Sequence, residues 1–289
     1  MNVLHPLPWH ASIWATLCER ALAGRLPHGL LLAGQEGIGK RHFASAFATW
    51  LLCERKPGGQ QGACGECRSC AQWLAGSHPD TVLMTPETGK REIRIEQVRG
   101  LLERLSLTRH HGGHRVVRVQ PAESLNINAA NALLKTLEEP PEGTVFLLSS
   151  ALPRSLPATV RSRVQHVRMA PPSPAQAIAW LEAQGLDQAE QRLAASAGNV
   201  MRAWSQRDEE DPALRDDYEG LLAVAARRDA NPLESIARIG TTRDAVSAFL
   251  LWFASHCHRQ LLAAKEGAAA ERFELMLREL TKARRALDG

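Results

Sequence analysis

The segment that most constrains the fold of this chain is GQEGIGKR, which follows the apolar run HGLLLAG and ends at Arg41. Gly34, Gly39 and Lys40 match the pattern G-x-x-x-x-G-K, and Gly37 adds a third glycine. In this pattern a glycine-rich loop between a strand and a helix brings backbone N–H groups and the lysine to phosphate. The segment therefore predicts an α/β nucleotide-type fold that begins with a buried strand.

The same segment lacks part of the chemistry of an ATPase. A Ser or Thr normally follows the lysine and binds Mg²⁺, but this chain has Arg41. An active site also needs an acidic residue after a second buried strand. The candidate strand, HRVVRVQPAE, carries Gln120 and Pro121 at that point, and we expect Glu123 to point elsewhere. We predict weak or no nucleotide binding at Lys40 and no catalysis there.

Two hydrophobic periodicities alternate along the first 170 residues. Apolar residues at helical spacing predict helices at 9–23, 39–53, about 95–108 and about 128–139. Short apolar runs predict strands at 28–34 (HGLLLAG), 81–84, 115–119 and 144–149. Strands that are separated by helices indicate a parallel sheet covered on both faces. The expected fold class is α/β, a P-loop-type parallel sheet with helices on both faces.

Helical spacing also predicts which side chains face the core. The predicted inward-facing residues are Trp9, Ile13, Leu17 and Ala21 in the first helix, Phe43, Phe47 and Trp50 in the second, and Ala129, Ala132, Leu133, Thr136 and Leu137 in the fourth. The charged residues of the fourth helix, Lys135, Glu138 and Glu139, are expected at the surface.

Composition divides the chain into three parts. The segment APPSP at 170–174 reads as a linker, and the residues beyond it have a helical composition rich in Ala, Leu, Arg and Glu. We expect a nucleotide-binding-like domain at 1–170, a small helical domain at 171–207 and an all-α domain at 208–289. The acidic stretch 208–211 separates the last two.

Four cysteines lie close together in the sequence, namely Cys53, Cys64, Cys67 and Cys70. The run CGECRSC contains two overlapping C-x2-C steps, and a loop-forming segment lets Cys53 reach them. Four thiolates without an open coordination position are typical of a structural zinc site. An iron–sulfur cluster is the main alternative, since the same ligands hold one. Free reduced thiols are the third possibility.

Charge and hydropathy bound the function classes. The 35 basic and 31 acidic side chains exclude a polycation that binds nucleic acid by charge alone. No apolar run reaches the roughly 18 residues of a membrane-spanning helix. The N-terminal residues lack the pattern of a secretory signal, so we expect a cytoplasmic protein with reduced cysteines. Cys18 and Cys257 stand apart from the cluster and are expected to be buried apolar residues.

Longer motifs carry a family resemblance. The run NINAANALLKTLEEPPEGTVFLLSS at 126–150 resembles the signature of clamp-loader subunits of the AAA+ class, most closely the delta-prime family of bacterial DNA polymerase III. The cysteine cluster, the HPD at 78–80 and the RSRV at 161–164 occur in the order found in that family. The resemblance covers about 10–206, and the helical tail matches only in kind. It implies that 1–170 is an AAA+ domain, that 171–207 is its helical lid and that 208–289 is a collar or oligomerisation domain.

The resemblance implies specific residue functions. Cys53, Cys64, Cys67 and Cys70 would be the ligands of a structural Zn²⁺. Arg163 stands at the Arg of the family's Ser-Arg-Cys motif, which reaches the ATP of the neighbouring subunit. An arginine finger supplied in trans stabilises charge on the transferred phosphoryl group. The Cys of that motif is replaced by Val here, a change that is not expected to disturb the arginine.

Two further positions correspond to nucleotide-facing positions of active members, and one of them, Met201, departs from the pattern. Ser150 falls near the position at which active members place a polar residue facing the γ-phosphate. In GNVMRAW, Met201 stands where active members have a nucleotide-contacting Arg, and Arg202 is one residue out of register. This departure, together with those at Arg41 and Gln120, implies a subunit that does not hydrolyse ATP itself. The ATP and Mg²⁺ of its reaction would belong to the neighbouring subunit.

The resemblance also implies partners. They are the gamma/tau and delta clamp-loader subunits, with the sliding clamp and primer-template DNA reached through the hetero-oligomeric complex, which is part of a DNA-directed DNA polymerase holoenzyme. One alternative is an active gamma/tau-like motor ATPase, which predicts hydrolysis by the isolated chain. A second is a nucleotide or nucleoside kinase with a four-cysteine zinc lobe. A third is a zinc-stabilised AAA+ interaction module outside replication.

Overall fold

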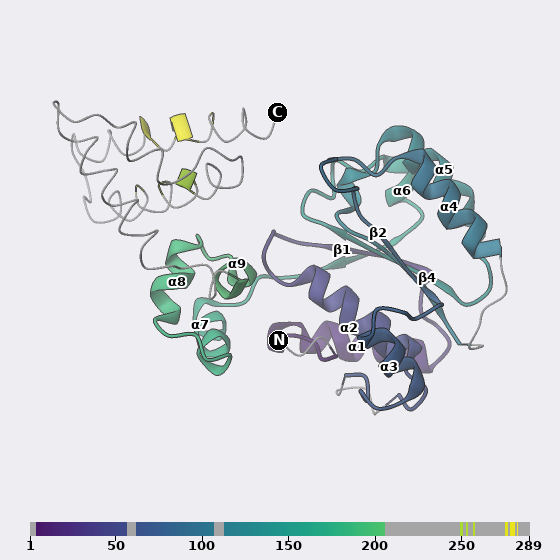
Figure 1. Cartoon of the computed structure of the whole chain (residues 1–289), viewed down its shortest axis with the longest axis horizontal. Coiled ribbons are helices and arrows are strands. Elements are labelled where there is room, and N and C mark those ends of the chain that lie inside the picture. Colours follow the sequence, from purple (N-terminus) through teal and green to yellow (C-terminus); the bar gives the residue numbers. More distant parts are fainter. Residues whose placement is uncertain are drawn as a thin grey trace. The chain divides into compact units, whose positions relative to one another are not determined.

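The computed structural model describes residues 4–56, 62–106 and 113–205, together with a few positions between 249 and 282. It divides into two compact units, Met1–Gln176 and Ala177–Gly289 (Figure 1). The predicted collar domain at 208–289 lies almost entirely outside the described residues, so that prediction remains a prediction. Among the described residues, no helix is long and apolar enough to cross a membrane.

The first unit is built on one parallel sheet with the strand order β2-β3-β4-β1-β5. Its strands are β1 (Gly29–Ala33), β2 (Thr81–Met84), β3 (Arg115–Val119), β4 (Thr144–Ser150) and β5 (Gln165–Arg168). The four predicted strands are confirmed within one residue. The fifth, β5, was not among them because QHVR has only one buried residue, Val167, and its polar side chains give no apolar run.

Helices cover both faces of the sheet, as predicted (Figure 1). On one face lie α1 (Ala11–Leu22), α2 (Lys40–Leu52) and α3 (Arg68–Leu74). On the other lie α4 (Ile95–Ser106), α5 (Ile127–Glu138) and the short α6 (Ala158–Arg161). Two short 3-10 turns, η1 (Pro8–His10) and η2 (Ala122–Ser124), precede α1 and α5. Because both faces are covered, the central strands β1 and β4 are almost wholly buried.

An aromatic cluster forms the core between the sheet and α2. Trp14, Phe43, Phe47 and Trp50 are each fully buried, and Phe47 stacks on both Phe43 and Trp50 with ring centroids 6.0 Å apart. Trp14 packs edge-on against all three rings. The inward face predicted for α2 is therefore confirmed.

The predicted face of α1 needs a correction. Its buried residues are Trp14, Leu17 and Cys18, whereas Ile13 and Ala21 are only partly buried. The aromatic rings of α2 require a large partner at their centre, and Trp14 supplies it. The helix is therefore rotated by about one position from the face that the predicted spacing selects. Cys18 is buried and apolar in its surroundings, as predicted.

The opposite face of the sheet packs on α4 and α5. Ala129, Leu133 and Leu137 of α5 are fully buried, as predicted, together with Ala130. Ala132 is only partly buried at the margin of this face, as is Thr136. Asn126 begins the helix by accepting a hydrogen bond from the amide of the residue three positions later, at 2.9 Å. The predicted surface residues of α5 are exposed.

The described part of the second unit consists of three short helices. They are α7 (Pro174–Ala183), α8 (Ala189–Ala195) and α9 (Val200–Ser205). Trp180 and Trp204 pack with their ring centroids 6.4 Å apart, and Leu181 and Ala203 are buried beside them. This unit therefore has its own small apolar core.

Candidate functional site

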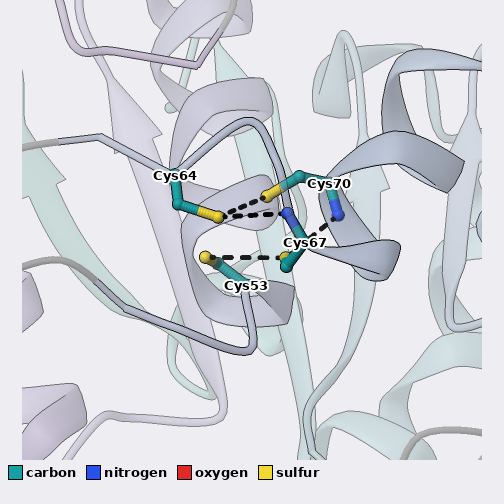
Figure 2. Close-up of side chains that lie close together, drawn as sticks. All are labelled: Cys53, Cys64, Cys67 and Cys70. Atoms are coloured by element: carbon teal, nitrogen blue, oxygen red, sulfur yellow. Dashed lines mark hydrogen bonds between the residues drawn. The ribbon is translucent and has the colours of Figure 1, made fainter.

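The four clustered cysteines converge on one point beside α2 and α3 (Figure 2). Their Sγ atoms all lie within 4.8 Å of one another. Sγ of Cys53 lies 4.0 Å from Sγ of Cys67, and Sγ of Cys64 lies 3.9 Å from Sγ of Cys70. Cys53 arrives from the C-terminal end of α2, and the other three come from the knuckle that begins α3. The structure thus brings together the four residues that the sequence singled out.

Backbone amides of the knuckle point at the sulfur atoms (Figure 2). The amide of Cys67 donates to Sγ of Cys64, and the amide of Cys70 donates to Sγ of Cys67, each at 3.4 Å. Gly65 allows this turn because its φ of 77° is one that other residues rarely adopt. Amide donors of this kind favour the charged thiolate over the neutral thiol.

The thiol pKa values reflect the same geometry. Burial acts to raise the pKa of Cys64, but hydrogen bonds from backbone amides and from the neighbouring thiols lower it to about 7. Burial and the adjacent thiols raise the pKa of the deeper Cys70. A bound cation would deprotonate every ligand, because metal-coordinated thiols lose their protons.

The cluster fits a single tetrahedral ion. With Zn–S bonds of about 2.3 Å, the edges of a sulfur tetrahedron are about 3.8 Å long. Two of the Sγ–Sγ separations, 3.9 and 4.0 Å, are close to that value, and all of them lie within 4.8 Å. Thiolates that ligate different irons surround an iron–sulfur cluster from outside and stand farther apart than four thiolates on one ion. The geometry therefore favours one ion, such as zinc, over an iron–sulfur cluster.

A buried polar chain connects the cysteine cluster to the sheet. The hydroxyl of Ser69 donates to the carbonyl of Leu52 at 2.7 Å and lies 2.8 Å from Nε2 of His78. Nδ1 of His78 accepts from the amide of Asp80 at 3.1 Å, so Nε2 carries the proton and donates to Ser69. The HPD motif thus has a structural function that the residue-level reasoning did not assign.

A cation–π contact forms a second connection. The guanidinium of Arg118 in β3 lies 4.6 Å from the ring centroid of Trp73 in α3. Burial lowers the pKa of Arg118 to about 10. Even at that value the side chain stays charged at neutral pH, so the contact persists under physiological conditions.

The phosphate loop has the backbone that its glycines predict. Gly37 and Gly39 adopt φ of 80° and 90°, and Gly39 caps the N-terminus of α2. A Cβ on Gly34 would lie 2.4 Å from the carbonyl oxygen of Met169, so only glycine fits there. The indole N–H of Trp9 donates to the carbonyl of Ile38 at 2.9 Å and holds the loop from the N-terminal side.

Lys40 is turned onto its own loop. Its Nζ donates to the carbonyl of Gly34 at 2.8 Å and also to that of Gln35. The side chain is buried, and this burial lowers its pKa, while the carboxylates of Glu123 and Glu36 act in the opposite direction. The ammonium group of Lys40 is thus already hydrogen-bonded to carbonyl groups of its own chain.

The strands that end beside the phosphate loop carry polar residues there. The position expected for a metal-binding carboxylate holds none. Gln120 and Ser149 are buried, and each has a side-chain atom without a partner in the described structure. Ser150 is fully buried, and its Oγ accepts from the amide of Leu152 at 3.1 Å. These residues lie at the C-terminal edge of the sheet, where the loop also begins.

Glu123 is not turned away from this edge, contrary to the prediction. Its Oε1 accepts a hydrogen bond from the amide of Ala151 at 2.9 Å, directly after β4. It is also close enough to raise the pKa of Lys40. The short turn η2 brings Glu123 back over the end of β4, a change of direction that the sequence spacing did not show.

Arg163 lies at the opposite edge of the sheet. It stands two residues before β5, and the adjacent Val164 packs on Gly29 at the start of β1, where a glycine Cβ would come within 2.8 Å of Cγ1. Lys40 follows the other end of β1. Because the strands are parallel, about 13 Å of strand separates the two edges at about 3.3 Å per residue.

The guanidinium of Arg163 is held by its own chain. Nε donates to Oε1 of Glu138 at 2.6 Å, and Nη2 makes an ion pair with the same oxygen. Nη1 donates to the carbonyl of Thr159 at 2.9 Å and to Oγ of Ser162 at 3.3 Å. The sequence reasoning placed Glu138 at the surface and did not identify this pair.

The lid positions lie on α9. Met201 is partly buried, and the amide of Arg202 donates to Oδ1 of Asn199 at 2.9 Å, which caps the helix. The offset of one residue between Met201 and Arg202 places their side chains about 100° apart around the helix.

Comparison with known proteins identifies the family. The family model "DNA polymerase III, delta subunit" matches residues 9–173. A DNA polymerase III subunit delta-prime from Pseudomonas aeruginosa is 42% identical over 200 residues, which are 68% of this chain and 60% of that protein. The subunit delta-prime of Escherichia coli strain K12 is 40% identical over 174 residues, which are 60% of this chain and 52% of that protein. Each alignment spans less than two thirds of the relative's length.

A more distant relative and a solved structure are also similar to this chain. A DNA polymerase III subunit tau from Escherichia coli strain K12 is 34% identical over 140 residues, or 48% of this chain and 21% of that protein. A gamma-subunit-related protein from Thermotoga maritima has a TM-score of 0.48 at 16% identity and covers 94% of this chain and 92% of its own. The family model covers more than half of the residues, and the delta-prime relatives align over the same region. This chain therefore belongs to the DNA polymerase III delta-prime family, as its motifs predict.

Proposed function

We propose that this chain is a non-hydrolysing subunit of a replicative clamp loader and that it presents Arg163 to the ATP of a neighbouring motor subunit. The observation that carries the proposal is the separation of Arg163 from Lys40 by the length of β1. An arginine at that edge does not reach the phosphate loop of its own chain. This position supports the proposal that Arg163 acts on a nucleotide held by another chain, as an arginine finger in trans.

The phosphate loop supports the second half of the proposal. Arg41 replaces the hydroxyl that binds Mg²⁺, and Gln120 replaces the carboxylate. Lys40 donates to two carbonyls of its own loop, so a phosphate would have to displace both hydrogen bonds. Glu123 lies at the same edge, but its Oε1 already accepts a hydrogen bond from the amide of Ala151. With Arg41 in place of the hydroxyl, Gln120 in place of the carboxylate and the lysine occupied, hydrolysis at this loop is not expected.

The remaining parts of the proposal concern assembly. The motor subunits (gamma/tau), the delta subunit, the sliding clamp and primer-template DNA are the proposed partners, by analogy with the tau and delta-prime relatives. We propose that a helical lid and a collar, at 171–207 and 208–289, join the subunits. In the cysteine cluster, Zn²⁺ would cross-link the end of α2 to α3 and thereby stiffen this face of the domain.

The test is replacement of the arginine in the reconstituted complex. We expect Arg163→Ala to leave the chain folded and assembled and to lower the DNA-stimulated ATPase kcat by at least tenfold, a small part of the roughly 10³ to 10⁵ measured for arginine fingers. Arg161→Ala is the matched control, because Arg161 lies two residues away and its side chain has no hydrogen bond within the described structure. Unchanged turnover with Arg163→Ala would exclude the proposed function.

A further inference from the structure

The guanidinium of Arg163 is oriented by a small set of acceptors. An arginine has five N–H donors, and the contacts of Arg163 engage Nε, Nη1 and Nη2. Thr159 and Ser162, on α6 and at its end, hold Nη1. Glu138, at the end of α5, holds Nε and Nη2 through one oxygen. The side chain therefore has a defined direction although it is 30% exposed.

Glu138 contributes more to this arrangement than its neighbour does. The hydrogen bonds that Arg163 donates to Glu138 all go to Oε1. Glu139 is equally close in sequence and is exposed, but among the described residues no hydrogen bond or ion pair joins its carboxylate to Arg163. The run of two glutamates thus contains one residue that contacts the arginine and one that serves as a natural control.

The ion pair between Glu138 and Arg163 is one in which a phosphate group can replace the carboxylate. The Glu138 side chain is 47% exposed, and ion pairs of such exposure contribute little to stability. Breaking the ion pair therefore costs Arg163 little free energy when a more highly charged triphosphate approaches. Until then the carboxylate limits the rotamers of the Arg163 side chain, so that less conformational entropy is lost when the arginine binds the phosphate. The carbonyl of Thr159 maintains the direction throughout.

We propose that Glu138 is a positioning residue for Arg163, which it holds in the direction needed by the phosphate of the neighbouring subunit. This inference rests on the proposed function of Arg163. Because Glu138 acts through the arginine, it affects the transition state and not the binding of ATP to the motor subunit. Its removal is expected to change kcat and to leave KM unchanged.

The experiment is a double-mutant cycle in the reconstituted complex. Glu138→Ala, Arg163→Ala and the double variant are compared with the wild type over a range of ATP concentrations. Glu138→Gln keeps an oxygen acceptor at the same place, and Glu139→Ala is the matched control. Gel filtration establishes that each variant enters the complex in equal amount.

The expected result separates positioning from a structural effect. Glu138→Ala lowers kcat about fivefold, well within the roughly 10²-fold that a misplacement of 1 Å can cost, and KM stays within about twofold of wild type. Glu138→Gln recovers most of the loss, and Glu139→Ala behaves as the wild type. In the Arg163→Ala background, Glu138→Ala has no further effect, because the group that it positions is absent.

Each other outcome has a definite meaning. Wild-type or faster turnover with Glu138→Ala would overturn the inference, and a faster rate would show that the carboxylate restrains the arginine. A further loss in the Arg163→Ala background would also overturn it, in favour of a structural contribution. If Arg163→Ala itself is unchanged while its control is normal, the proposed function fails, and the inference fails with it.

Discussion

At the scale of single residues, the sequence shows which residues stand at the motif positions, but it does not show which residues they contact. Arg41 and Gln120 stand at positions defined by motif spacing, so their departure from an ATPase is visible in the sequence. The pairing of Glu138 with Arg163 spans 25 positions and depends on how α5 meets α6. The return of Glu123 to the end of β4 depends on one short turn. Contacts between residues that are far apart in the chain produce no periodic pattern in the sequence.

A buried histidine gives a prediction at this scale. His10 is fully buried against the edge of Phe43, with neither ring nitrogen hydrogen-bonded, and burial, His42 and Lys40 lower its pKa to about 3. Between that value and the ordinary pKa of about 6.5, the unfolded chain binds a proton that the folded chain does not. Stability therefore falls as pH drops below 6.5.

We expect the wild-type chain to lose about 1 kcal/mol of unfolding free energy through His10 between pH 7 and pH 5.5. His10→Phe should flatten this dependence, since a phenyl ring fits an apolar site and does not titrate. Urea unfolding at several pH values, with zinc present throughout, measures the slope. His166→Gln, an exposed position on β5, is the control. An unaltered slope in His10→Phe would contradict this assignment.

At the scale of elements, the cysteine cluster is an insertion between α2 and β2 that is tied to the sheet at two places. Ser69 and His78 join α3 to the end of α2 and the start of β2. Trp73 packs under Arg118 of β3. The insertion thus rests on the same face as the aromatic core, so the state of the cysteines affects the stability of the whole first unit.

We expect one Zn²⁺ per chain, and we expect its removal to lower the melting temperature clearly. A structural zinc ion contributes folding energy directly, about 10 to 16 kcal/mol in isolated zinc-finger peptides and less where a large core already exists. Metal analysis and thermal unfolding of Cys67→Ser test this, with Cys18→Ala as a control that keeps the cluster intact. Absorbance from an iron–sulfur chromophore, or full stability without metal, would contradict the zinc assignment.

At the scale of the whole molecule, the parallel sheet places two kinds of chemistry at opposite edges. The phosphate loop and the ends of β3 and β4 meet at the C-terminal edge, while Arg163 lies at the N-terminal edge beside β1. Parallel strands of four to seven residues keep these edges apart. Under the proposed function, each edge would contribute half of an ATP site, and a complete site would require two chains.

The isolated chain is therefore expected to hydrolyse Mg-ATP no faster than its Lys40→Ala variant. A phosphate-release assay on the purified full chain measures this, and the variant reports any contaminating ATPase. Mg-ATP at 1 mM should also leave the melting temperature unchanged. We expect a Kd of about 1 mM or weaker, and a ligand stabilises a protein only when its concentration approaches or exceeds its Kd. Turnover that disappears with Lys40→Ala would show an active motor and overturn the proposal.

The sequence by itself determined the phosphate-loop frame, four of the five strands, the inward face of α2 and the set of four cysteines. These features are local or periodic, because each depends on spacing within one element or one motif. Only the tertiary structure decided the fifth strand, the rotation of α1 toward Trp14, the polar chain through His78 and the pairing of Glu138 with Arg163. Each of these depends on which elements become neighbours, and packing between distant segments sets that, not the properties of any one segment.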